Sequence, residues 1–432
     1  MKRTRLYMAL VLAGLAATPA FADTYAITGG TVYTLGAAGK IEHGTVIIKD
    51  GKITAVGANV AIPADAKRID ATGKMVTPGI IDPESVFGLD EVDQVTQTQD
   101  GSLTSTRYTA AFDPTAGINP RSMVIPVNRV EGVTRAVIAP GNNSSVLQGR
   151  GSVISLEGTE GYVLKDPVAL FVTLGETGQK TAGGARAAAI EVLREAFQDA
   201  KDFAGNRAAY DKAGRRAYSL SRPDLEALQP ALKGEMPVVV QVDRASDIEA
   251  AMDLAAEFKL KLVVSGGAEA WMVAARLAKA KVPVILNPMR DLPEAFESLG
   301  ARLDDAALLQ KAGVLIAFEV GDTHKSWNVR QYAGNAVANG LPWNDALAAI
   351  SLNAARIYGL DKGVGTLEAG KDADLVVWSG DPLEVTSFAD QVFIRGKAVP
   401  MSDRQIELRD RYLPYVKSNP PALPPAYPPS GN

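Results

Sequence analysis

The chain has 432 residues, enough for one large domain and an accessory module, and its 47% hydrophobic and 22% charged residues are typical of a globular protein. It contains no cysteine, which excludes disulfides, thiolate metal ligands and a cysteine nucleophile. A formal net charge of −4 without a basic stripe argues against nucleic acid as a partner.

The first 22 residues have the pattern of a secretory signal. Three basic residues precede an apolar run that ends near Ala17, and the small residues Ala20 and Ala22 flank Phe21. The apolar run is shorter than the roughly 20 residues that a membrane span needs. We therefore expect cleavage after Ala22, export to a periplasmic location and no membrane span. Cleavage removes the three basic residues, which takes the net charge from −4 to −7.

Residues 23–76 contain short runs of alternating polar and apolar residues, which predict β-strands. Asp50 and Gly51 stand between two β-branched runs, which indicates a hairpin. Residues 361–400 add two further strand and turn units. Because so few strands cannot close a core alone, we expect the two segments to form one small β-sandwich.

Residues 77–360 alternate between β-rich runs and helical patterns, as repeated strand and helix units require. The predicted fold class is α/β, a (β/α)8 TIM-like barrel of residues 77–360 with a small β-sandwich domain formed from both termini. Residues 401–432 end in a proline-rich stretch and are interpreted as an extended tail. The predicted barrel strands are Thr134–Ala139, Ala169–Leu174, Pro237–Val242, Lys261–Val264, Pro283–Leu286 and Val314–Phe318. The predicted helices are Gly184–Asp202, Ala245–Phe258, Ala268–Ala280 and Trp343–Ile350.

Two motifs carry a family resemblance. Thr77 to Asp82 reads TPGIID, and Gly365 to Val376 reads GTLEAGKDADLV. Both resemble the amidohydrolase superfamily, and Arg121 to Gly158 resembles its imidazolonepropionase-like members, so the resemblance covers nearly all of the mature chain. It implies hydrolysis of carbon–nitrogen bonds other than peptide bonds, with zinc or another divalent metal activating water at the strand ends.

The metal ligands that the resemblance implies are mostly replaced. The His-x-His pair after the first strand falls on Glu84 and Val86, and two later histidine positions hold Gln241 and Gly266. Only Asp322 matches, at the end of the last strand. Four of the five alignable ligand positions are thus replaced, and we expect no metal or other cofactor in a site of the family type.

The candidate catalytic residues are Asp322 and His324, which could perform acid–base chemistry without a metal. His324 could instead replace a lost metal ligand, or be a loop histidine bonded to its neighbours. The candidate ligand-binding residues are Glu84, Gln241, Asp243 and Arg244. Arginines that border strand ends could meet an anionic ligand or pair with nearby acids: Arg121, Arg129, Arg150, Arg244 and Arg290. An acidic cluster could bind calcium or magnesium or form a solvated face: Asp82, Glu84, Asp90, Glu91 and Asp93.

Two functions follow from these observations. The first is an exported hydrolase of the amidohydrolase type whose metal site is largely lost. The second is a catalytically inactive, metal-free protein that binds a small molecule or a partner at the barrel mouth. A small-molecule ligand is expected in both cases, and a homo-oligomer is compatible with either.

Overall fold

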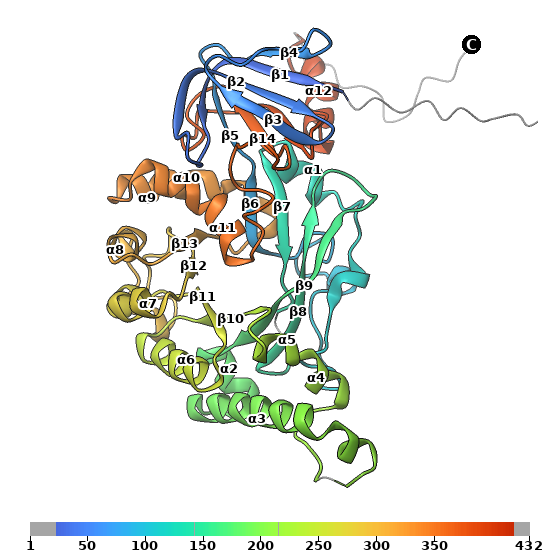
Figure 1. Cartoon of the computed structure of the whole chain (residues 1–432), viewed down its shortest axis with the longest axis vertical. Coiled ribbons are helices and arrows are strands. Elements are labelled where there is room, and N and C mark those ends of the chain that lie inside the picture. Colours follow the sequence, from blue (N-terminus) through green and yellow to red (C-terminus); the bar gives the residue numbers. More distant parts are fainter. Residues whose placement is uncertain (1–22, 142, 215, 419–432) are drawn as a thin grey trace, which may run out of the picture.

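The computed structural model describes residues 23–141, 143–214 and 216–418. A sheet domain lies at one end of the molecule and a strand barrel at the other (Figure 1). The expected signal segment, residues 1–22, lies outside the described residues, as does the tail beyond residue 418. Within the described residues, no helix combines the length and the apolar character that a membrane span requires.

Both termini contribute strands to the sheet domain, as expected. Its strand order is β16-β15-β14-β5-β1-β2-β3, and β4 pairs with β1, so the strands form one sheet rather than two. A bridge between Lys52 and Asp372 brings β3 back toward β14 and folds the sheet over its own core. The predicted hairpin at Asp50 and Gly51 is confirmed, and both residues have positive φ. The strands are β1 Tyr25–Tyr33, β2 Lys40–Lys49, β3 Lys52–Gly57, β4 Lys67–Asp70, β5 Met75–Pro78, β14 Leu375–Trp378, β15 Ala389–Ile394 and β16 Lys397–Ala398.

The predicted TIM-like barrel is confirmed, with one departure. The strand order is β13-β12-β11-β10-β9-β8-β7-β6, and β8 runs antiparallel to both of its neighbours. The connections 139–146 and 156–162 are too short to hold a crossover helix, so these strands are joined as hairpins instead of βα units. The barrel strands are β6 Ile80–Ser85, β7 Val133–Ile138, β8 Leu147–Ser155, β9 Val163–Thr173, β10 Pro237–Val242, β11 Lys261–Gly266, β12 Val284–Leu286 and β13 Ile316–Phe318.

Helices cover the outer face of the barrel (Figure 1). The predicted helix Ala245–Phe258 is confirmed as α6, and Ala268–Ala280 divides into a 3₁₀ turn, η3, and α7. Residues 401–432 were interpreted as a tail, yet Arg404–Val416 forms a helix, α12. The helices are α1 Val124–Arg129, α2 Gly175–Thr181, α3 Arg186–Asp211, α4 Arg222–Ala227, α5 Gln229–Leu232, α6 Ala245–Phe258, α7 Ala274–Ala280, α8 Asp305–Lys311, α9 Val329–Ala338, α10 Trp343–Ala349, α11 Leu352–Ile357 and α12 Arg404–Val416, with η3 Ala270–Val273 and η5 Thr323–Asn328.

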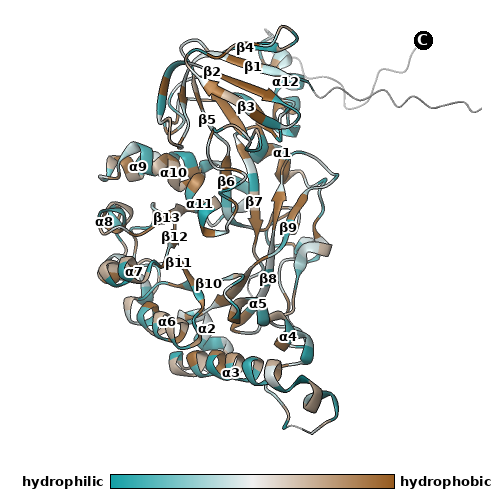
Figure 2. Cartoon of the chain, in the orientation of Figure 1, coloured by the Kyte–Doolittle hydropathy of each residue, from teal (hydrophilic) through white to brown (hydrophobic). Residues whose placement is uncertain are grey.

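Alternation along the barrel strands divides the core into an inner and an outer layer. Hydrophobic residues gather on strands such as β7 and β9, whereas α12 is mostly hydrophilic (Figure 2). The inner layer is a hydrophobic cluster that contains Val239, Val263 and Ala317. Residues of α11 pack against these side chains and belong to the same cluster. Their neighbours Val240, Val264 and Phe318 belong to the cluster that faces the helices. This period of two decides which side chains beyond the strand ends face the interior.

An arginine connects the barrel to the sheet domain. Arg135 lies on β7 and is 5% exposed. Its Nε donates to Asp374 Oδ2 at 2.5 Å, and its Nη2 donates to Asp372 Oδ2 at 2.5 Å. Both acids stand just before β14, so this buried ion pair fixes the barrel against the sheet.

Replacing Arg135 by leucine should destabilise the protein by about 3–5 kcal/mol, because the buried Asp374 carboxylate would lose its partner. Urea denaturation at pH 7 measures the difference from the unchanged protein. Arg68→Leu is the matched control, because Arg68 is exposed on β4, and its effect should stay within about 0.5 kcal/mol. Equal stability of the two variants would contradict this account of the junction.

Candidate functional site

The mouth of the barrel is lined by polar residues that the alternation of the strands directs inward. Val239 and Ala317 face the interior, so Gln241 and Glu319, two residues further along, face the same way. Ser265 stands in the same relation to Val263 on β11. Because the carboxyl ends of parallel strands meet at one end of the barrel, these side chains share the mouth.

The strands β6 and β13 bring three carboxyl groups to the mouth. Ser265 Oγ donates a hydrogen bond to Glu84 Oε2 at 2.7 Å, and Glu84 Oε1 is enclosed without any hydrogen-bond partner. Asp82 Oδ1 accepts from the Glu84 backbone N–H at 3.1 Å, and Asp82 Oδ2 accepts from Ser326 Oγ. The third carboxyl group is that of Glu319, directly after β13.

Burial raises the pKa of all three carboxyl groups. Burial raises the pKa of Glu84 to about 8, and the nearby Glu319 carboxylate adds to this effect. Burial also raises the pKa of Glu319 to about 7, with contributions from Asp82 and Asp243. Burial alone raises the pKa of Asp82 to about 6. Glu84 and Glu319 therefore hold at least one proton between them at neutral pH.

A fourth acid, Asp243, occupies the space beside Gly266. Asp243 is 7% exposed, and its Oδ1 accepts from Arg290 Nη1 at 2.8 Å and from the Ala268 backbone N–H at 3.1 Å. Gly266 has a φ of +86°, and a Cβ atom placed on it would lie 2.7 Å from Asp243 Oδ1. A side chain at position 266 would therefore collide with a carboxylate that two donors hold in place.

These residues do not fit a zinc centre of the kind that the family resemblance implies. Val86 has no donor atom, Gly266 has no side chain, and the amide of Gln241 is a poor ligand for transition metals. Among the described residues, Glu84, Glu319 and Asp82 do not form a group of three whose ligand atoms lie within 4.8 Å of one another. The mouth thus offers buried carboxyl groups where a zinc site needs converging imidazoles.

Solvent reaches the mouth on the side of β10. Gln241 is exposed although it faces inward, and its Oε1 accepts from Thr173 Oγ1 at 3.3 Å. Arg244, a predicted ligand-binding residue, is also exposed and stands immediately before α6. The Arg244 side chain does not cap α6, and Glu269 Oε2 accepts from the Ala245 N–H at 2.9 Å.

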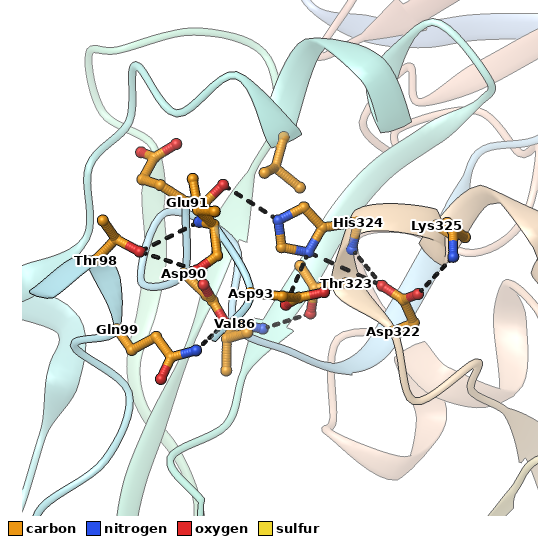
Figure 3. A network of polar contacts seen from close by, with 12 residues as sticks. Val86, Asp90, Glu91, Asp93, Thr98, Gln99, Asp322, Thr323, His324 and Lys325 are labelled. Atoms are coloured by element: carbon orange, nitrogen blue, oxygen red, sulfur yellow. Dashed lines mark hydrogen bonds and ion pairs between the residues drawn. The ribbon is translucent and has the colours of Figure 1, made fainter. Parts of the chain in front are cut away.

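The predicted catalytic pair lies beside the mouth, in a separate network (Figure 3). Asp322 Oδ1 accepts from the His324 backbone N–H at 3.0 Å, and Asp322 Oδ2 lies 3.3 Å from Lys325 Nζ. His324 faces Asp93 and the backbone carbonyl of Glu91. Within the described residues, these contacts connect Asp322 to the start of η5 rather than to Glu84 or Glu319.

The other predicted arginines are dispersed. Arg290 reaches the mouth and forms an ion pair with Asp243. Pairing with a nearby acid is one of the two alternatives that the sequence left open for this arginine. Arg150 lies 3.5 Å from Asp113, Arg129 donates to two backbone carbonyls, and Arg121 is exposed. The acidic cluster divides in the same way. Asp82 and Glu84 line the mouth, whereas Asp90, Glu91 and Asp93 surround His324.

Sequence reasoning did not select Glu319 as a site residue. Its signal was the alternation of β13, because a residue two positions beyond the inward Ala317 must face the interior. Of the predicted ligand-binding residues, the structure brings Glu84, Gln241 and Asp243 to the strand ends together with Glu319.

The raised pKa of Glu84 predicts a pH-dependent stability. Its pKa rises from 4.5 in the unfolded chain to about 8 in the folded protein, so folding favours the protonated carboxyl group. The contribution of Glu84 to the free energy of unfolding is therefore complete below pH 4.5 and is lost as the pH rises toward 8. Glu84→Gln removes this loss. Its stability relative to the unchanged protein should increase between pH 5 and pH 8, by at most about 1.4 kcal/mol per pH unit.

Urea denaturation at pH 5, 6.5 and 8 measures this difference. The control is Glu195→Gln, because Glu195 is exposed on α3 and should show no such trend. A stability difference for Glu84→Gln that stays constant across the three pH values would rule out a buried, protonated Glu84.

Comparisons with known proteins agree with the fold. The sequence model of the Amidohydrolase family matches residues 243–399. The imidazolonepropionase of Methylobacterium sp. (strain 4-46) is 26% identical over 79% of this chain and 88% of that protein. Amidohydrolase tasK of Hapsidospora irregularis is 26% identical over 82% of this chain, and the match spans 40% of the length of tasK.

Solved structures are also similar to this chain. The crystal structure of an amidohydrolase from Thermotoga maritima MSB8 is 30% identical, with a TM-score of 0.79 over 87% of this chain and 99% of that chain. Phenylurea hydrolase B, at 16% identity and a TM-score of 0.53, shares the fold. The full-length match at 30% identity, together with the family match in the C-terminal half, shows that this chain belongs to the amidohydrolase family.

Proposed function

We propose that the barrel mouth binds a small molecule through a positively charged nitrogen group, and that it does so without a metal ion. The observation that carries the proposal is the pair of carboxyl groups of Glu84 and Glu319, of which Glu84 Oε1 has no hydrogen-bond partner. A ligand with an ammonium or guanidinium group would supply both the missing donor and the missing positive charge.

The charges around the mouth favour such a ligand. Glu84, Glu319 and Asp82 are acidic, and in the described part of the chain the guanidinium that reaches them is that of Arg290. Arg290 lowers the pKa of Glu319, but its hydrogen bond goes to Asp243. The negative charge of the mouth is thus only partly compensated, and a cation would favour the ionised form of each carboxyl group.

The donor set supports a metal-free site. Asp243 fills the space beside Gly266, and Val86 and Gln241 replace two further imidazoles that a zinc hydrolase of this family would use. A metal-free mouth therefore agrees with the replacement of four of the five alignable ligand positions.

A second candidate is hydrolysis of a carbon–nitrogen bond other than a peptide bond by the carboxyl pair itself. The observation that favours it is the coupled titration of Glu84 and Glu319, with pKa values of about 8 and about 7. A pair that shares a proton has one member to activate water and one to protonate the leaving nitrogen. Asp322 and His324 have no part in this scheme, because their contacts lie along η5 and with the loop after β6.

Matched ligands test the first candidate. Alkylguanidinium ions and alkylureas have the same shape but differ in charge. Titration calorimetry on the mature chain measures the affinity of each, and the difference reports the effect of the charge. We expect the guanidinium compounds to bind at least about tenfold more tightly, or ~1.4 kcal/mol. Binding should tighten from pH 6 to pH 8, as Glu84 and Glu319 ionise. The double variant Glu84→Gln, Glu319→Gln should lose the preference, and Glu195→Gln should keep it.

Equal affinity for the two ligand series would contradict a cation site. Turnover of amide or lactam substrates that is unaffected by chelators and abolished by Glu319→Gln would favour the carboxyl-pair hydrolase. Turnover that requires added zinc would contradict both candidates. Export through residues 1–22 also stays a proposal, based on the signal-like pattern of that segment.

A further inference from the structure

A group of metal-ligating side chains lies beside the mouth, apart from the strand ends. Asp90, Asp93 and His324 each offer one ligand atom, and these atoms all lie within 4.8 Å of one another. Figure 3 shows His324 reaching from the start of η5 toward the loop that follows β6. None of the three occupies a position at which the family resemblance places a metal ligand.

The orientation of the His324 ring is the first observation that favours a cation at this cluster. Its Nε2 lies 3.3 Å from the backbone carbonyl oxygen of Glu91, which can only accept, so Nε2 carries a hydrogen. In the neutral ring, Nδ1 then holds the lone pair. Nδ1 lies 3.5 Å from Asp93 Oδ1 and 3.9 Å from Asp322 Oδ1. A lone pair facing two carboxylates is repulsive unless a positive charge stands between them.

This ring orientation is also the one that metal-bound histidines adopt. A histidine that binds a metal through one nitrogen usually donates its other ring N–H to a backbone carbonyl or a carboxylate. The Glu91 carbonyl supplies that acceptor for His324. The hydrogen bond fixes the tautomer and directs Nδ1 toward the acids.

The Asp90 carboxylate is the second indication. Its Oδ2 accepts a long hydrogen bond from Gln99 Nε2 at 3.4 Å, whereas its Oδ1 is enclosed and has no hydrogen-bond partner. Burial and the nearby Asp93 raise the pKa of Asp90. A cation between Asp90, Asp93 and His324 would satisfy the unpartnered oxygen and remove the repulsion between the acids.

We propose that Asp90, Asp93 and His324 Nδ1 bind one divalent transition-metal cation of the zinc class. One imidazole nitrogen with two carboxylate oxygens is a donor set for zinc or a similar ion, whereas calcium and magnesium take oxygen ligands throughout. Three protein ligands leave one coordination position for water. The side-chain exposures of 28% for His324 and 67% for Asp93 give an ion access from solvent.

The cation would close the seam of the barrel. β6 and β13 stand at the two ends of the strand order, and the pairing of strands does not continue between them. Beside the cluster, the Val86 backbone N–H donates to Thr323 Oγ1 at 3.0 Å, which already connects the β6 segment to η5. A metal held by Asp90, Asp93 and His324 would add a further, stronger connection across the same seam.

Because the chain contains two histidines, ring nitrogen NMR can test this site directly. The mature protein would be prepared without a histidine tag, labelled with ¹⁵N-histidine and titrated with zinc. We expect the Nε2–H tautomer for His324 before titration. About one equivalent of zinc should then shift the His324 Nδ1 resonance and leave His43 unchanged, because His43 is exposed on β2 of the sheet domain.

Two variants and one control complete the experiment. Asp93→Asn and His324→Asn should abolish stoichiometric zinc binding and the rise in Tm that zinc produces, while keeping the metal-free Tm of the unchanged protein. His43→Asn should behave like the unchanged protein in both measurements.

Two results would overturn the proposal. In the first, His324 is protonated on both nitrogens at neutral pH and does not respond to zinc, so that a proton alone explains the cluster. In the second, stoichiometric zinc binding survives His324→Asn. Loss of that remaining zinc in Glu84→Gln would then place the ion in the mouth and contradict the metal-free proposal for the mouth as well.

Discussion

The contact on which the mouth depends is the one between Asp243 and the backbone around Gly266. Arg290 and the Ala268 N–H hold the Asp243 carboxylate in the space that a side chain at position 266 would need. The left-handed backbone of Gly266 makes any other residue there strained as well. Restoring a histidine would therefore require both a new backbone conformation and the displacement of a buried ion pair.

Once that position is closed to an imidazole, the remaining mouth chemistry is that of carboxyl groups. Glu84 and Glu319 are enclosed by the strand ends and receive one side-chain donor between them, from Ser265. Burial and mutual repulsion raise their pKa values, so they favour protons or a cationic partner. This argument supports a cationic ligand, and the loss of imidazoles at Val86, Gln241 and Gly266 disfavours a zinc site of the family type.

Much of the fold follows from the sequence, because alternation and turn chemistry act locally. The Asp50-Gly51 hairpin, the strand Pro237–Val242 and the helix Ala245–Phe258 are found at the predicted positions. The antiparallel β8 was not anticipated, since its direction depends on two short connections rather than on its own residues. The helix α12 was also missed, because the proline-rich end of the tail dominated the interpretation.

Only part of the candidate site could be predicted from the sequence. Replacement of imidazoles at Gln241 and Gly266 is visible in the sequence, whereas the filling of the Gly266 space by Asp243 depends on tertiary contacts. Glu319 could have been identified by counting from Ala317. The position of Asp322 could not be predicted, because Gly321 has a positive φ and the chain turns there, which leaves Asp322 bonded to the start of η5. The proposed role of His324 depends on contacts with residues that are far away in the sequence.

The most direct measurement is the anomalous diffraction signal of zinc in crystals of the mature protein soaked with the ion. We expect one peak, between His324 Nδ1 and the carboxylates of Asp90 and Asp93, and no peak at the ends of β6, β10 and β11. A zinc peak bounded by Glu84 and Glu319 would show that the mouth retains a metal centre and would contradict this account.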